Sequence, residues 1–162
     1  MKKDFDLTIK RRQRRLNNPY ERFIELEELF FYAKNCVNFI ENALDYAKEQ
    51  YADEEFDEDT FKVIEDEIKR IEADIPLMEE DLLRLGKYVK QASKKLEKLD
   101  FNIEEVKTKF LENIGLLIGF ANDLIKEAEL LRIEAESITY YITEIYKNYE
   151  LTEEEFMKKM EE

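Results

Sequence analysis

A chain of 162 residues is long enough for a single domain to bury a core without disulfides or metals. Charged residues make up 41% of it beside only three glycines and two prolines, which is typical of long helices, and the 44% hydrophobic content argues against intrinsic disorder. The absence of histidine and the single cysteine, Cys36, exclude an intramolecular disulfide and a Cys–His catalytic pair, and from the cysteine we predict a cytoplasmic protein.

The net charge of −14 is unevenly distributed along the chain. Residues 1–15 carry seven basic and two acidic side chains, a charge of +5, so the remainder carries −19. Such an acidic body repels nucleic acid and anionic membranes, and we therefore expect a protein partner with a basic surface. The basic arm matches nuclear-import or RNA-binding segments, or is a solvated tail or one that neutralises the acidic body. Its principal residues are Lys10, Arg11, Arg12, Arg14 and Arg15.

A first helix is predicted from Pro19, because Asn18 can cap it and Glu21 lies three residues after the cap. Its apolar residues alternate in steps of three and four, as in a heptad seam. This seam contains Phe23, Leu26, Phe30, Ala33, Val37, Ile40, Leu44, Ala47 and Tyr51, and the stripe is widened by Ile24, Leu29, Phe31, Cys36, Phe39 and Ala43. So wide a stripe predicts contact with two neighbouring helices, or with one helix and a second protomer.

A second helix is predicted from about Thr60 to Leu99, after an acidic segment, Asp53–Asp59, that favours a helix start. Pro76 interrupts this helix, but the heptad phase continues through it, so we predict a kink, or a short break between collinear segments, and no reversal. A full break there would instead give a compact four-helix bundle. The seam contains Phe61, Ile64, Ile68, Ile71, Ile75, Met78, Leu82, Leu85, Val89, Ala92, Leu96 and Leu99.

The third helix is predicted to open with a capping box formed by Asn102 and Glu105. Its seam runs from Ile103 through Leu117 to Tyr149, with a stutter between Phe110 and Ile114. Gly115 and Gly119 follow the stutter, which suggests a hinge or a close contact with a partner. Close packing inside the bundle is the interpretation that we favour for these glycines.

The resulting fold is all-α, an elongated antiparallel three-helix coiled-coil bundle with a short C-terminal helix. A second capping box, Thr152 with Glu155, places the start of that short amphipathic helix near Leu151. The domain organisation is a basic arm over residues 1–18, the bundle over 19–150 and the short helix over 151–162. The third helix is the longest, so its C-terminal part projects unless it folds back or the chain dimerises.

Aromatic residues gather at one end of this bundle and form the candidate binding surface. Six of the nine tyrosines lie near this end, where acidic residues surround them, as expected for an anchor for a basic partner. The alternative is that they close the end of the core. The candidate residues are Tyr46, Tyr51, Phe56, Tyr140, Tyr141, Tyr146 and Tyr149.

The function that these features favour is a non-catalytic protein–protein interaction module, such as an adaptor, an assembly protein or an immunity-type protein, with a homo-oligomer as one form. An acidic inhibitor that mimics nucleic acid, such as a phage-encoded antagonist of a nuclease or a CRISPR complex, is the second hypothesis. No catalytic residue, cofactor or metal ligand is predicted for either.

An Mg²⁺-dependent enzyme is the third hypothesis. The segments Glu54–Glu58 (E-E-x-x-E) and Glu97–Asp100 (E-x-x-D) resemble the metal motif of all-α nucleotide pyrophosphohydrolases of the MazG and dimeric dUTPase type. That resemblance implies carboxylate ligands for Mg²⁺ and nucleotide substrates. The two segments are predicted at opposite ends of one helix, so this hypothesis ranks last.

Overall fold

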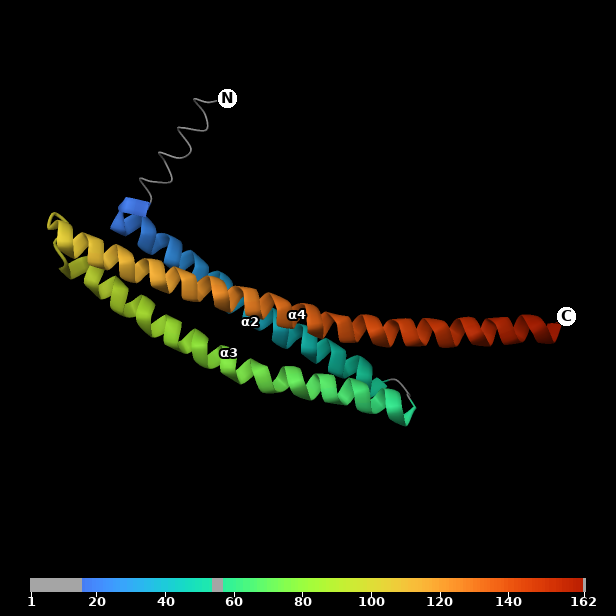
Figure 1. The fold of residues 1–162 in the computed structure, drawn as a ribbon. Coiled ribbons are helices and arrows are strands. Elements are labelled where there is room, and N and C mark those ends of the chain that lie inside the picture. The colour runs from blue at the N-terminus through green and yellow to red at the C-terminus, as the bar shows by residue number, and fades with distance from the viewer. Residues whose placement is uncertain (1–15, 54–56, 162) are drawn as a thin grey trace, which may run out of the picture.

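Three long helices make up nearly all of residues 16–53 and 57–161, the part of the chain that the computed structural model describes (Figure 1). Helix α2 spans Pro19–Asp53, α3 spans Glu58–Lys98 and α4 spans Glu104–Glu161. Helices α2 and α4 run in the same direction and α3 runs antiparallel to both. The predicted all-α, antiparallel three-helix bundle is therefore confirmed.

The predicted heptad seams form the core between the helices. Most of the described seam residues are buried, and Phe61, Leu99 and Ile103, which lie near helix ends, are 36–51% exposed. The seam residues that are only partly buried are Phe30, Tyr51, Leu82, Leu96, Val106 and Leu117. Alanines in the seams let the helices approach closely, and the described residues include no buried polar or charged side chain. The largest fully buried side chains are Leu26, Ile40, Ile64, Ile71, Leu85 and Ile114.

The stutter in α4 moves the buried face of the helix. Phe110, Ile114 and Ile118 are buried at successive steps of four, whereas Leu117, the predicted seam residue, is only partly buried. Each step of four advances about 40° around a helix of 3.6 residues per turn, so the stripe drifts from the heptad line. The seam regains its heptad spacing from Ala121 onward.

Local side-chain hydrogen bonds set the helix starts. Asn18 Oδ1 accepts hydrogen bonds from the backbone N–H groups of Tyr20 (3.0 Å) and Glu21 (3.3 Å), which confirms the predicted cap. Asp57 caps α3 by accepting from the Thr60 N–H at 2.8 Å, and this bond keeps the pKa of the Asp57 carboxyl below its ordinary value.

The predicted start of the third helix at Asn102 is wrong. Helix α4 begins at Glu104, and the preceding turn is held by Asp100, whose Oδ1 accepts the Asn102 backbone N–H at 3.1 Å. The ring of Phe101 in the same turn packs against Phe110, with ring centroids 5.0 Å apart. The turn therefore uses an acidic side chain before Asn102 and an aromatic anchor.

Two breaks that the sequence suggested are absent from the helices. Helix α3 continues through Pro76, so the prediction that the chain does not reverse there is confirmed, and the alternative of a break with a compact four-helix bundle is wrong. Helix α4 continues to Glu161, so the separate short helix after Leu151 is also wrong. No glycine or proline lies between Gly119 and Glu162, and the Thr152–Glu155 pattern is compatible with a helix interior. As a result, α4 extends well beyond α2 and α3 (Figure 1).

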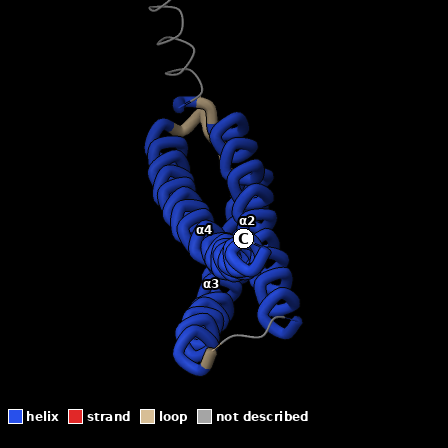
Figure 2. The backbone as a smooth tube through the Cα atoms, turned by 90° about the vertical axis from the view of Figure 1, so that its right-hand side faces the viewer, coloured by secondary structure: helices blue, strands red, loops and turns tan. Residues whose placement is uncertain are grey.

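Polar side chains tie each pair of helices together at the surface. Tyr32 of α2 donates to Glu129 of α4 at 3.0 Å, Lys48 of α2 pairs with Glu72 of α3, and Arg70 of α3 lies 2.8 Å from Glu134 of α4. Exposed pairs of this kind contribute little stability, but they restrict the register between helices. Viewed toward the end of α4, the helices wrap around one another (Figure 2).

None of the described helices is both long and apolar enough to cross a membrane.

Candidate protein interface

The structure divides the predicted aromatic surface between two sides of α4. Tyr46 and Tyr140 line a groove between α2 and α4, whereas Tyr141 lines a groove between α3 and α4. Tyr51 is partly buried and stacks on Phe61, with ring centroids 4.5 Å apart. The described candidates therefore do not form a single surface at the end of the bundle.

The remaining predicted site residues cannot be placed on this surface. Phe56 and the side chains of Tyr146 and Tyr149 lie outside the described part of the structure. The basic arm residues Lys10, Arg11, Arg12, Arg14 and Arg15 also lie outside it.

A row of exposed aromatic side chains follows α2 instead. Tyr32, Phe39 and Tyr46 lie seven residues apart, so they share one face of the helix, outside the buried seam. Each is about half exposed, at 50%, 49% and 55%, and Tyr140 of α4, which is 71% exposed, lines a groove with Phe39 and Tyr46. We call these four residues the aromatic row. Aromatic side chains are enriched in protein–protein interfaces, which makes the row the candidate site.

Helix α4 supplies polar groups along the edge of the aromatic row. Glu129 accepts the hydrogen bond from the Tyr32 hydroxyl, and this bond raises the pKa of the Tyr32 phenol. The Arg132 guanidinium lies 6.0 Å from the centre of the Phe39 ring, and its Nε is 3.7 Å from Glu136 Oε1. The two acids at this edge therefore each have a polar partner within the molecule.

Beside Phe39 and Tyr46 the surface is hollowed into an open groove of about 600 Å³. Threonine and asparagine side chains, together with one arginine and one glutamate, supply its hydrogen-bonding groups. The groove is lined by Phe39, Asn42, Ala43, Tyr46, Arg132, Glu136, Thr139, Tyr140 and Thr143. Its aromatic walls, open to solvent and mixed with polar groups, suit a side chain or helix of a protein partner.

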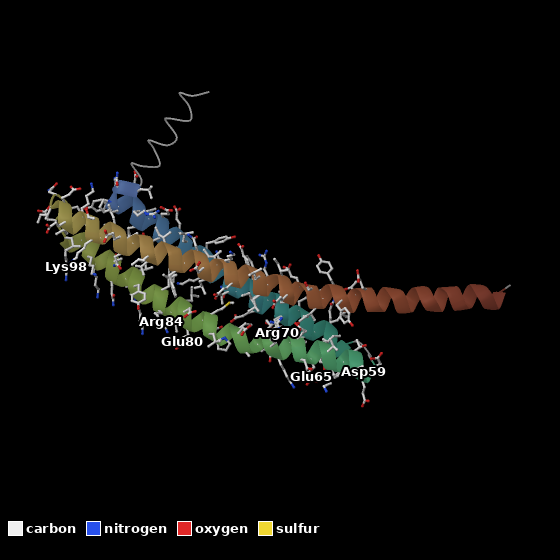
Figure 3. All side chains as sticks on the ribbon, viewed as in Figure 1. Asp59, Glu65, Arg70, Glu80, Arg84 and Lys98 are labelled. Carbon is white, nitrogen blue, oxygen red and sulfur yellow. The ribbon has the colours of Figure 1, made fainter. Side chains whose placement is uncertain are left out.

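The face of α2 that carries the aromatic row has few charges. Among the exposed side chains from Phe31 to Tyr46, only Lys34 and Asp45 are charged. The outer edge of α3 shows the opposite character, with charged residues such as Arg70, Glu80 and Arg84 along its length (Figure 3). In a chain with 41% charged residues, the α2 face has the charge depletion that characterises the centre of an interface.

Cys36 lies in the core next to this surface. The side chain is 3% exposed, as predicted for a small buried hydrophobe. Burial raises the pKa of its thiol, and the negative charge of Glu129 raises it further. The thiol therefore stays protonated at neutral pH and is a poor nucleophile.

The acidic motifs that suggested a magnesium site are far apart in the structure. Asp57 and Glu58 stand at the start of α3, and Glu97 and Asp100 stand at its other end, separated by a helix of 41 residues. At 1.5 Å per residue this separation is about 60 Å. Within residues 16–53 and 57–161, no three potential ligand side chains are grouped in a way that could hold a metal ion.

Gly115 and Gly119 of α4 do not pack closely inside the bundle, so that interpretation is wrong. A Cβ atom added at either position would have no heavy atom within 4 Å. Both glycines lie outside the core, and neighbouring Leu116 is 74% exposed. Close packing occurs instead at Gly86 of α3, where an added Cβ would lie 3.1 Å from Cζ of Phe30.

A signal for the aromatic row is present in the sequence. The predicted seam assigns a heptad position to each residue of the first helix. Tyr32, Phe39 and Tyr46 share one of these positions, and that position lies outside the seam. Proximity to the end of the bundle does not by itself place residues on one face, because successive helical residues point about 100° apart. Of the residues that widened the predicted stripe, Leu29, Cys36 and Ala43 pack inward, whereas Ile24, Phe31 and Phe39 are exposed.

Comparison with protein-family models, curated proteins and solved structures finds no match for this chain.

Proposed function

We propose that this chain is a non-catalytic protein–protein interaction module of the adaptor, assembly or immunity type, and that it binds through the aromatic row. One observation carries the proposal. Four aromatic side chains, each about 50% exposed or more, lie together where the exposed surface of α2 has few charged residues. Hydrophobic residues exposed singly are common, but a row at heptad spacing beside a groove is the arrangement by which a helical surface receives another helix.

The hydrogen bonds and ion pairs around the row also support this proposal. Tyr32 is held by Glu129, and Arg132 lies between Phe39 and Glu136, so the side chains are partly ordered before a partner arrives. Ordering before binding lowers the entropy cost of association. Aromatic and arginine side chains are the types that most often dominate binding energy.

The decisive experiment is affinity capture from the source cells with the wild-type protein and two serine variants. Phe39→Ser removes the central ring of the row, and Leu83→Ser removes a leucine that is 69% exposed on α3 and so serves as the matched control. We expect the Phe39→Ser variant to lose the captured partner and the Leu83→Ser variant to retain it. Equal retention by both would contradict the proposal.

The acidic inhibitor is a second candidate, favoured by the net charge of −14. Binding to the nucleic-acid groove of an enzyme depends on many exposed acids, so it weakens steeply as salt rises. Capture at about 50 mM and 500 mM salt therefore separates the two. A partner held through the aromatic row survives the higher salt, whereas a nucleic-acid enzyme held by charge is lost.

A further inference from the structure

A second groove lies between α3 and α4, on the side of α4 that faces away from the aromatic row. It consists of two hollows of about 320 and 430 Å³, and Glu134 lines both of them. The residues of its walls recur every three or four positions from Val63 to Asp81 of α3 and from Glu127 to Tyr141 of α4. Each set therefore lies along one face of its helix. We call this surface the α3–α4 groove.

Apolar side chains form the floor of the α3–α4 groove and both of its ends. The floor consists of core residues such as Met78. At one end Val63 and Tyr141 are 54% and 46% exposed, and at the other Leu77 and Leu130 are 60% and 56% exposed. Fourteen residues separate Val63 from Leu77, so the two ends are about 21 Å apart along α3. A groove of this length fits a partner helix with apolar residues two heptads apart.

Acidic side chains outnumber basic ones along the α3–α4 groove. Arg70 lies 3.0 Å from Glu67 and 2.8 Å from Glu134. Arg84 lies 4.0 Å from Asp81. Asp74 and Glu127 have no ion-pair partner among the residues that the structure describes. With two arginines against five acids, these groups carry a charge of −3, which favours a partner helix that is basic beside its apolar face. The five acids that line the groove are Glu67, Asp74, Asp81, Glu127 and Glu134.

Other parts of this chain match the groove less well. The chain after residue 15 carries a charge of −19, so the bodies of two copies repel one another. Leu16, which follows the basic arm, lines a hollow with Lys107 of α4, and Leu130 lies 23 residues, about 35 Å, farther along that helix. Lys10 is six residues from Leu16 and so extends at most about 21 Å from it. The cluster of basic residues from Lys10 to Arg15 therefore falls short of Leu130 in its own chain.

We propose that the α3–α4 groove binds a basic amphipathic helix of a partner protein, which packs on α3 and α4 as a fourth helix. Its apolar face covers the exposed apolar side chains at the two ends of the groove, and its lysine or arginine side chains pair with Asp74 and Glu127. This surface is separate from the aromatic row, so the proposal stands or fails independently of the proposed function.

Fluorescence anisotropy with a labelled helical peptide tests the proposal on the full chain. The peptide has about 18 residues, enough to span the groove, with leucine at the two core positions of each heptad and lysine elsewhere. A matched peptide carries glutamate in place of lysine. We expect only the lysine peptide to bind, with an affinity that falls about tenfold in Leu77→Ser or Leu130→Ser. Equal binding of the two peptides overturns the proposal.

Two control variants show whether the peptide binds in the groove. Leu83→Ser removes a leucine that is 69% exposed on another face of α3, and Phe39→Ser removes the central ring of the aromatic row. Both should keep the wild-type affinity, and circular dichroism confirms that every variant is folded. A loss with either control that equals the loss with Leu77→Ser places the peptide elsewhere and overturns the proposal.

The contribution of charge is measured separately. Glu127→Gln should weaken binding of the lysine peptide about two- to fivefold. Glu80→Gln removes the same charge on the outer edge of α3 (Figure 3) and should weaken binding less. Equal effects of the two variants would mean that the peptide responds to the net charge of the chain, which overturns the proposal.

A variant of the basic arm tests whether the arm, from the same chain or from a second copy, is the occupant of the groove. At about 150 mM salt, where distant charges are screened, neutralising the arm should leave the peptide affinity nearly unchanged. A rise of about tenfold or more would mean that the arm competes with the peptide, and it overturns the proposal of a separate partner. The residues replaced by glutamine in this variant are Lys10, Arg11, Arg12, Arg14 and Arg15.

Discussion

The three glycines of the chain have different surroundings, and the difference predicts opposite responses to a methyl group. At Gly119 of α4 an added Cβ meets no heavy atom within 4 Å. Gly119→Ala should therefore raise the free energy of unfolding by about 0.5 to 1 kcal/mol, since alanine loses less backbone entropy in a helix. Gly86→Ala should raise the free energy of unfolding less, or lower it, because the added Cβ would lie 3.1 Å from Cζ of Phe30. Urea denaturation of both variants checks this, and an equal gain would show that Phe30 moves without cost.

Asn18 is the other residue whose role follows from local geometry. Its side chain accepts two of the otherwise unpaired N–H groups at the start of α2. Asn18→Ala should lower the free energy of unfolding by about 1 kcal/mol. The neighbouring Asn17, also exposed, gives the matched control Asn17→Ala. Thermal denaturation should show a lower midpoint for Asn18→Ala alone, and equal shifts would count against the cap.

At the scale of the element, Pro76 conflicts with the helix that surrounds it. It lies inside α3, is exposed, and has no N–H to donate to the carbonyl of Glu72. The helix persists because Ile75 and Met78 on either side remain buried in the core. Pro76→Ala should therefore stabilise the protein by about 1 to 3 kcal/mol.

Urea denaturation also checks the Pro76→Ala prediction. Leu77→Ala, at a position that is 60% exposed, supplies a neighbouring change that leaves the backbone bonds intact. We expect it to change the stability little. If Pro76→Ala destabilised the protein, the curvature imposed by proline would be required for packing.

A sequence pattern predicts a structural element well when it is repeated over many turns. The heptad seams predicted the three helices and most of the core, because the apolar residues recur along the whole length of each helix. The ends of α4 were misplaced, since a capping pattern such as Thr152 with Glu155 is a short signal that a helix interior also tolerates. The division of the tyrosines between two grooves was not predicted, because neighbouring helical residues such as Tyr140 and Tyr141 point in different directions.

Contacts between helices were beyond prediction for a related reason. Their register depends on packing across the bundle, which no single helix encodes. The pairing of Tyr32 with Glu129 and the approach of Phe30 to Gly86 are therefore visible only in the structure.

At the scale of the whole molecule, acidic side chains meet across the α2–α3 seam. The Glu41 carboxyl of α2 lies beside that of Glu79 of α3. Hydrogen bonding to Glu79 raises the pKa of Glu41 above its ordinary value of 4.5, and burial and the charges of Glu79 and Asp45 raise it further. Glu41 is therefore easier to protonate in the folded state than in the unfolded state, so its ionisation at neutral pH opposes folding.

The sign of this shift predicts how stability depends on pH. As pH falls from 7 through the raised pKa of Glu41 toward 4.5, this carboxyl binds its proton in the folded state first, and the free energy of unfolding should rise. Asp57 acts in the opposite direction but at lower pH, because its pKa lies below 3.8 and its cap is lost only there. Stability should therefore pass through a maximum between the two ranges.

A single substitution isolates the contribution of Glu41. Glu79→Gln removes the facing negative charge, so it should raise the stability at pH 7 and reduce the rise between pH 7 and 4.5. Glu80→Gln changes the net charge equally on the outer edge of α3 (Figure 3) and should keep the wild-type pH profile. Urea denaturation at several pH values distinguishes the two. Identical profiles for both variants would mean that the rise reflects the net charge of the whole chain and not the contact between Glu41 and Glu79.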